Sequence, residues 1–122
     1  MNNKKSKKKL KYKNQLFYLN IYTYENGRMK LMIENKKESH EITINVDDSF
    51  LLSGHIALDP FVLKDGLINV LKKSKLVYEI KGIMNYDYVD IPVVQFSMKK
   101  LKEYDYDGLI KHFDNVRENQ FK

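Results

Sequence analysis

The chain has 122 residues, enough for one domain with a single core, and it contains no cysteine, which excludes disulfides, thiolate metal sites and cysteine nucleophiles. Hydrophobic residues make up 43% and charged residues 31% of the sequence, which is typical of a globular protein. No apolar run approaches the roughly 20 residues that span a bilayer, so we expect no membrane partner and, by default, a cytoplasmic location.

The first segment in chain order, residues 1–13, is predicted to be a disordered lysine-rich tail. It contains no acidic residue and seven lysines: Lys4, Lys5, Lys7, Lys8, Lys9, Lys11 and Lys13. The net charge of the whole chain is +6, so without these seven charges residues 14–122 sum to −1. Like charges repel and the segment has little to bury, so we expect residues 14–122 to form the single domain.

The lysine tail has two interpretations. It could bind the phosphates of DNA or RNA with salt-sensitive, sequence-independent affinity, or it could serve only to keep the protein in solution. Arg28 and Arg117 are the only arginines in the sequence. Lysine lacks the planar fork with which arginine reads guanine, so sequence-specific base readout is not expected.

A meander of three antiparallel strands is predicted next, because apolar residues alternate with polar ones. The strands span residues 15–24, 29–34 and 41–46. Asn26-Gly27 joins the first two strands and favours a type I′ turn, in which both central residues need positive φ. In the third strand, Thr43 is expected to face solvent. A meander of this kind leaves one face of the sheet open.

Three tyrosines, Tyr18, Tyr22 and Tyr24, are predicted to lie on the outer face of the first strand. Aromatic rings on an open sheet could stack on the bases of single-stranded RNA. Tyrosine is also enriched in protein-binding hot spots, so the same face could bind a protein. Alternatively, a helix could cover this face and bury the rings. These residues form the candidate interaction surface of the domain.

A loop is predicted over residues 47–54, followed by a helix that begins at Asp59-Pro60 and ends at Lys73. Aspartate caps a helix start, and proline suits the first helical position. The apolar stripe of this helix consists of Leu63, Leu67, Val70 and Leu71.

A second hairpin and a last helix complete the predicted fold. The hairpin pairs residues 76–83 with 88–98, and Pro92 predicts an edge strand or a bulge because it has no N–H to donate. The helix follows Asp105 or Asp107 as its cap, with Leu109, Phe113 and Val116 on its apolar face. The sequence thus predicts an α+β domain, an antiparallel sheet of about five strands with two helices on one side.

One set of residues suggests catalysis. Asp59, Glu79 and Lys81 resemble the two carboxylates and lysine with which metal-dependent nucleases hold a cation and activate water. Asp59 is already expected to cap a helix, so a nuclease is kept only as a remote alternative. We therefore predict no enzyme, no catalytic residue, no metal and no cofactor.

Other acidic residues and the histidines give no clear site. Asp87 with Asp90, and Glu103 with Asp105 and Asp107, could hold a cation or imitate phosphates for a nucleic-acid-binding partner. They could equally cap helices and meet solvent. The histidines are scattered along the chain without metal-ligand spacing, and they are His40, His55 and His112.

Residues 41–98 carry four short motifs: Thr43-Ile44-Asn45, then His55-Ile56-Ala57-Leu58-Asp59, then Val70 to Leu76, and finally Ile91-Pro92-Val93-Val94-Gln95-Phe96. This stretch resembles a domain-of-unknown-function family of small proteins found on phage and conjugative elements of AT-rich bacteria. The family has asparagine after the aspartate where this chain has Pro60, which puts a ligand role for Asp59 in doubt. The resemblance implies a mobile-element setting. It carries over no activity and no site residue, because the family has no established activity.

Two classes of function follow. The first is a non-catalytic, stoichiometric inhibitor of a host defence nuclease, of the anti-CRISPR or anti-restriction type, whose partner is a host protein or a protein–nucleic acid complex. The alternative is an accessory protein that binds DNA or RNA without sequence preference through its lysine-rich tail.

Overall fold

The computed structural model describes residues 8–46 and 55–120. Lys4, Lys5 and Lys7 of the predicted tail and the predicted loop over 47–54 lie outside the described residues. The strands and helices, in chain order, are β1 Lys9–Tyr12, β2 Gln15–Thr23, β3 Met29–Glu34, β4 Ser39–Glu41, β5 Ile56–Ala57, α1 Phe61–Lys64, α2 Leu67–Lys73, β6 Val77–Tyr86, β7 Val89–Phe96, α3 Met98–Tyr104 and α4 Tyr106–Gln120.

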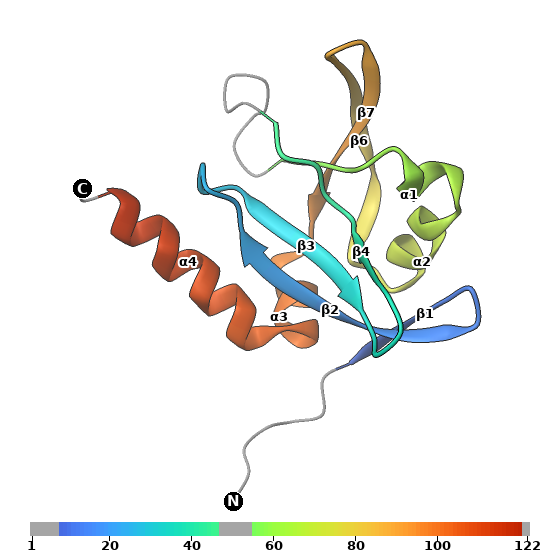
Figure 1. The fold of residues 1–122 in the computed structure, drawn as a ribbon, viewed down its shortest axis with the longest axis horizontal. Coiled ribbons are helices and arrows are strands. Elements are labelled where there is room, and N and C mark those ends of the chain that lie inside the picture. Colours follow the sequence, from blue (N-terminus) through green and yellow to red (C-terminus); the bar gives the residue numbers. More distant parts are fainter. Residues whose placement is uncertain (1–7, 47–54, 121–122) are drawn as a thin grey trace, which may run out of the picture.

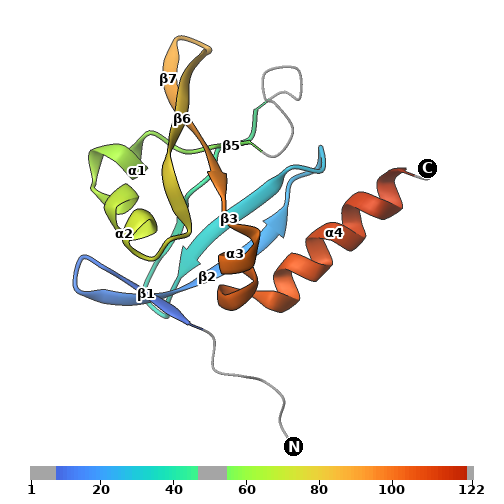
Figure 2. The ribbon, with the colours of Figure 1, turned by 180° about the vertical axis from the view of Figure 1, so that it is seen from behind.

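The strands form two antiparallel sheets, one in the order β1-β2-β3-β4 and one in the order β5-β7-β6. The predicted α+β class is confirmed, although the described residues form seven strands and four helices instead of about five and two. The second sheet and α1 to α3 lie behind the four-stranded sheet, and α4 runs along β2 (Figures 1 and 2). The front face of the four-stranded sheet is therefore left open.

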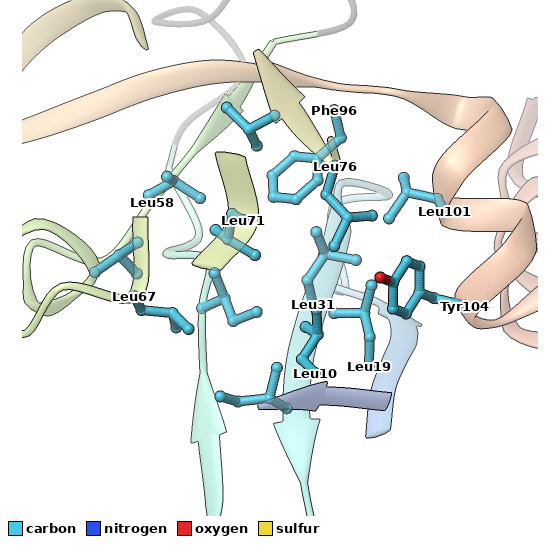
Figure 3. Close-up of a cluster of buried hydrophobic side chains, with 14 of the residues drawn as sticks. Leu10, Leu19, Leu31, Leu58, Leu67, Leu71, Leu76, Phe96, Leu101 and Tyr104 are labelled. Carbon is cyan, nitrogen blue, oxygen red and sulfur yellow. The ribbon is translucent and has the colours of Figure 1, made fainter. Parts of the chain in front are cut away.

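The main core lies between the four-stranded sheet and the elements behind it. Leu10, Leu19 and Leu31 of the sheet face Leu76 and Leu101 across this core (Figure 3). Full burial of a leucine side chain contributes roughly 1.5–3 kcal/mol. The alternation predicted for β2 and β3 is confirmed, because the apolar residues predicted to face inward are buried and their neighbours are not.

The prediction of a disordered tail over residues 1–13 is wrong for Lys9–Tyr12, which form strand β1. Its register pairs Lys9 with Tyr18 and Tyr12 with Gln15, and Leu10 and Tyr12 are buried. The lysines of β1 point to solvent, while Leu10 and Tyr12 enter the core. Burial of these two side chains stabilises the strand despite the charge of the lysines. A two-residue turn with positive φ at both positions, Lys13 and Asn14, joins β1 to β2.

The hairpin of β2 and β3 is confirmed, but its predicted turn type is wrong. In this loop Gly27 has positive φ and Asn26 does not, whereas a type I′ turn needs positive φ at both. The N–H of Gly27 donates to the carbonyl of Tyr24 at 2.9 Å. The N–H of Tyr24 donates in turn to the carbonyl of Arg28 at 2.8 Å. The loop therefore has three residues, a form in which one glycine takes the left-handed conformation as a bulge.

The third strand of the meander is shorter and earlier than predicted. β4 ends at Glu41, and Thr43 forms an isolated bridge with Leu58 as the chain passes to the second sheet. Thr43 is buried, contrary to the prediction that it faces solvent. Its hydroxyl accepts a hydrogen bond from the N–H of Leu31 at 3.1 Å, which replaces a bond that a continued strand would make.

The helix predicted over 60–73 is two helices, because Gly66 has φ +80 and interrupts it. A left-handed residue ends an α-helix, and glycine adopts this conformation without steric cost. The interruption turns α2 away from α1. Leu67 and Leu71 are buried as predicted, whereas Leu63 on α1 is exposed.

The sequence predicted an edge strand or a bulge at Pro92. Pro92 lies in β7, the central strand of its sheet, so the edge position is wrong, whereas the sheet is irregular beside it. The carbonyl of Pro92 accepts from the N–H of Leu58 at 2.9 Å, which places the proline nitrogen on the side of the two-residue strand β5. The missing donor therefore costs no bond to β6. The irregular pairing between Ile80 and Gly82 of β6 lies opposite Val93 and Val94, beside the proline.

Helix α3 was not predicted, and α4 packs with a different face from the one expected. The Ser97 hydroxyl caps α3 by accepting from the N–H of Lys100 at 3.2 Å. On α4, Leu109 and His112 are buried, whereas Phe113 is 42% exposed, so its predicted core position is wrong. The His112 ring is bonded through Nδ1 to the Thr23 hydroxyl at 2.8 Å, and burial lowers the pKa of His112. The polar pair of Thr23 and His112 therefore forms the contact between α4 and β2, where an apolar contact of Phe113 was expected.

Asp105 joins α4 to the free edge of β2. β1 pairs only with residues 15–18 of β2, and beyond them the Asp105 carboxylate accepts from the N–H of Ile21 at 2.8 Å. Its other oxygen accepts from the N–H of Gly108 at 3.2 Å, as a helix cap does. The predicted capping role of Asp105 is confirmed, and the same buried carboxylate also covers an open sheet edge.

None of the helices in residues 8–46 and 55–120 combines the length and the apolar composition needed to cross a membrane.

Gly108 is predicted to be required for this junction. A Cβ at Gly108 would lie 2.1 Å from Asp105 Oδ2 and 2.9 Å from the carbonyl oxygen of Ile21. We expect Gly108→Ala to lower the free energy of unfolding by about 1–3 kcal/mol in urea denaturation. Gly82→Ala is the matched control, because a Cβ there meets nothing within 4 Å and its stability should be nearly unchanged. Equal stability of both variants and the natural chain would contradict the close approach.

Candidate functional site

The uncovered side of the four-stranded sheet, here called the open face, carries the outward residues of β1, β2 and β3 (Figure 1). Its members alternate with the buried core residues and are Lys9, Lys11, Leu16, Tyr18, Asn20, Tyr22, Lys30, Met32 and Glu34. They include lysines of the predicted tail and two of the three tyrosines of the predicted interaction surface. Folding therefore brings two separately predicted sites onto one surface.

Lys9, Tyr18 and Glu34 form a row across the open face. Lys9 is the cross-strand partner of Tyr18 on β1, and Glu34 is its partner on β3. The Lys9 ammonium lies 5.2 Å from the centroid of the Tyr18 ring, within the range of a cation–π contact. Tyr18 is 39% exposed, so part of its side chain is accessible to a ligand.

Glu34 orders the neighbouring side chains of the open face. One of its oxygens, Oε1, accepts from the Asn20 amide and from the Tyr22 hydroxyl, each at 2.7 Å. The bond to Glu34 is the main cause that raises the pKa of Tyr22 to about 12, and burial adds to it. Tyr22 is therefore a neutral ring, 46% exposed and held by its hydroxyl.

Tyr24 differs from the other two tyrosines. Its hydroxyl donates to Glu41 and lies 2.9 Å from the Thr43 hydroxyl, and its side chain is half-buried. Burial and the Glu41 bond raise the pKa of Tyr24. The Tyr24 ring is thus fixed by hydrogen bonds at the point where the chain leaves the sheet. It offers less surface to a ligand than Tyr18 or Tyr22.

Positive charge is concentrated on the β1 side of the open face. The first acidic residue of the chain is Glu25, so β1 carries two lysines and neither β1 nor β2 carries a carboxylate. Lys9 and Lys11 are exposed on β1. Lys8 pairs instead with Glu103 of α3 at 2.6 Å, and Lys13 lies 3.9 Å from the Asp65 carboxylate. The structure thus divides the four tail lysines that it describes between ion pairs and the open face.

The residues considered for a nuclease site have local partners. Asp59 Oδ1 accepts from the N–H of Phe61 at 3.1 Å, at the start of α1. Glu79 lies 3.4 Å from Lys81 on the same strand. Across the part of the chain that the structure describes, no three or more histidine, aspartate or glutamate side chains are grouped to hold a metal ion.

His40 also has local partners. His40 Nε2 lies 2.6 Å from Glu38, and the hydrogen bond to His40 is the main cause that lowers the pKa of the Glu38 carboxyl. The His40 ring packs beside Phe17 and Phe61, with ring centroids 5.8 and 6.0 Å away. His40 therefore belongs to an aromatic cluster at the edge of the core.

The hairpin of β6 and β7, which the sequence predicted, forms a second exposed feature, although its tip was not predicted to be a binding site. It extends away from the rest of the molecule (Figure 1), and its turn consists of Asp87 and Tyr88, with φ of +53 and +66. Tyr88 is 96% exposed, and Ile83 and Val89 are exposed nearby. A bulky residue in the left-handed region is strained, and such strain tends to occur at functional sites. The predicted strand over 88–98 placed Tyr88 in a strand, whereas it lies in the turn.

Comparison of the chain with family models, with curated proteins and with solved structures finds no match. The resemblance of residues 41–98 to a family on phage and conjugative elements stays a prediction.

The hydrogen bond between Tyr22 and Glu34 gives a titration test of the open face. The folded-state pKa of Tyr22 exceeds the ordinary value of 10, so the stability from this bond is complete below pH 10 and declines as pH rises toward about 12. We expect Glu34→Gln to lower the pKa of Tyr22 toward 10, measured by the NMR shift of its ζ carbon. Glu41→Gln should instead lower only the pKa of Tyr24. An unchanged Tyr22 titration in Glu34→Gln would refute the bond.

Proposed function

We propose that this protein is a non-catalytic module that binds single-stranded nucleic acid on its open face. The observation that carries the proposal is the cross-strand placement of Lys9 beside the exposed Tyr18 ring. A lysine next to an exposed aromatic ring supplies the two contacts that single-strand binders use, a charge for the phosphate and a face for the base. The lysines act here from an ordered strand, not from a disordered tail.

The physical chemistry favours a single strand over a duplex. Stacking of a base on an aromatic side chain contributes roughly 1–3 kcal/mol, but only an unpaired base exposes its face to a protein. The open face offers two exposed rings, Tyr18 and Tyr22, on one strand of the sheet. Lysine contacts with phosphate add affinity that falls as salt rises.

The affinity of this face is expected to depend on its β1 lysines. Replacing both Lys9 and Lys11 with Gln should weaken binding of a fluorescent dT15 oligonucleotide and reduce the slope of log K against log salt by about 1.4, since each lost contact with a single strand contributes about 0.7. The matched control is the Lys72→Gln, Lys73→Gln pair, which removes the same charge from α2 on the covered side of the sheet.

Fluorescence anisotropy at several salt concentrations measures both quantities. If the two double variants lose affinity equally, net charge and not the open face governs binding, and the proposal fails. No binding by the natural chain at low salt would reject it outright.

A second candidate function is a stoichiometric inhibitor of a host defence nuclease, of the anti-CRISPR or anti-restriction type. It is favoured by the β6–β7 hairpin, whose tip presents Tyr88 next to the exposed Val89. Residues 82–98 contain two acids, Asp87 and Asp90, and no basic residue, so the tip is complementary to a positively charged surface such as a nuclease uses for nucleic acid. The mobile-element setting implied by the resemblance is consistent with such a role.

If the hairpin tip binds a nuclease, replacing Tyr88 should abolish protection without lowering the stability of the protein. Tyr88→Gly relieves the left-handed conformation, so thermal unfolding should show stability unchanged or raised by up to about 1 kcal/mol. The same variant should lose the ability to restore plaque formation by phage on a strain with an active CRISPR or restriction system. Lys75→Gly, at another exposed residue with φ +65, should give the same stability change and keep full protection. Retained protection by Tyr88→Gly would exclude the tip as the contact.

A further inference from the structure

We propose that the row formed by Lys9, Tyr18 and Glu34 is a subsite for one nucleotide of the bound strand and that it prefers guanine. The inference rests on the proposed nucleic-acid-binding function and adds a base preference to it. The row runs from a cation on β1, through an aromatic ring on β2, to a carboxylate on β3. A nucleotide presents a phosphate, a base face and a Watson–Crick edge in the same order.

The dimensions of the sheet suit this placement. Neighbouring strands are about 4.8 Å apart, so the backbones of β1 and β3 are separated by about 10 Å on either side of β2. Lys9 lies on β1, across β2 from β3, and its ammonium is 5.2 Å from the centroid of the Tyr18 ring. A base stacked on Tyr18 with its phosphate at Lys9 would therefore direct its far edge toward Glu34.

The groups at the Glu34 end accept hydrogen bonds. A carboxylate has about four lone-pair sites, and the bonds from Asn20 and Tyr22 both fall on Oε1. These two bonds fix the carboxylate without using its full capacity. The Tyr22 hydroxyl gives its proton to Glu34, so its oxygen offers only lone pairs to a further partner. The base edge thus meets a fixed group of acceptors.

Guanine matches these acceptors better than the other bases. Its Watson–Crick edge has two adjacent donors, the ring N1–H and the exocyclic amino group, and the lone pairs that remain on Glu34 Oε2 and on the Tyr22 oxygen can accept both. Cytosine and adenine offer one amino group beside a ring acceptor, and thymine offers one N–H between two carbonyls. In those bases an acceptor would face the carboxylate, which costs free energy because both groups lose water without forming a bond.

This preference does not require arginine. The scarcity of arginine argues against readout of the O6 and N7 acceptors of guanine. Glu34 instead reads the donor edge, which is exposed only when the guanine is unpaired. The substrate class is therefore single-stranded nucleic acid with an unpaired guanine.

The test uses the full chain and labelled dT9 oligonucleotides in which the central base is T, G, A or C, with anisotropy as the readout. We expect the strand with guanine to bind at least about fivefold more tightly than the other three, as a well-placed pair of base contacts allows. Glu34→Gln should remove this preference and keep the affinity for dT9. Glu41→Gln is the matched control, because it removes the same charge from β4 and should retain the preference.

Tyr22→Phe provides a second variant in case Glu34→Gln does not fold. It keeps the ring but removes the hydroxyl, so the guanine preference should decrease while dT9 binding is kept. Free guanosine monophosphate is included as a competitor, and we expect it to displace the strand only at concentrations far above that of the strand.

The outcomes separate the inference from the function on which it rests. Equal affinity of the natural chain for all four strands, or a preference that survives both Glu34→Gln and Tyr22→Phe, overturns the guanine subsite and leaves single-strand binding standing. Displacement by guanosine monophosphate at a concentration equal to the strand overturns it as well, in favour of a free mononucleotide site. Binding of none of the four strands overturns the proposed function itself.

Discussion

The Asp105 carboxylate is the contact on which the arrangement of this protein depends. It accepts from the N–H of Ile21 at the edge of β2 and from the N–H of Gly108 in the first turn of α4, at 2.8 and 3.2 Å. A buried carboxylate without partners would be costly, and an unpaired strand edge would invite other chains. The Asp105 carboxylate gains two hydrogen bonds and pairs one N–H of the strand edge, because α4 lies close to β2. This close approach needs glycine at position 108, since a Cβ there would collide with Asp105 and with the carbonyl of Ile21. With α4 beside β2, the front of the sheet stays uncovered.

The open face is ordered before any ligand arrives. Glu34 holds Asn20 and Tyr22 through hydrogen bonds, and Lys9 lies over Tyr18. Side chains that are already fixed lose less entropy on binding, so more of the contact energy is available as affinity. A surface of freely rotating lysines would have charge without this order. The structural features that support nucleic-acid binding are therefore the row of neighbours and its hydrogen bonds, in addition to the net charge.

The hairpin tip and the open face use different physical means. The open face is a flat surface of partly exposed, hydrogen-bonded side chains, whereas the tip projects a single almost fully exposed ring at Tyr88. Asp87 and Tyr88 keep a left-handed turn although neither is glycine. The free energy stored there is offset by the regular pairing from Gly82 to Tyr86 with Val93 to Val89. Charge also separates the two surfaces, with lysines on β1 and only acids on residues 82–98.

The sequence by itself determined the α+β class, the hairpin of β2 and β3 and the outward tyrosines, because side-chain alternation depends only on local order along the chain. It did not reveal β1, because the charge of the lysines hid the alternation of Leu10 and Tyr12. Tertiary structure decided that Pro92 is central, that His112 and not Phe113 faces β2, and that Lys9 lies beside Tyr18. Each of these depends on which distant segment pairs with which, and local periodicity carries no information about distant partners.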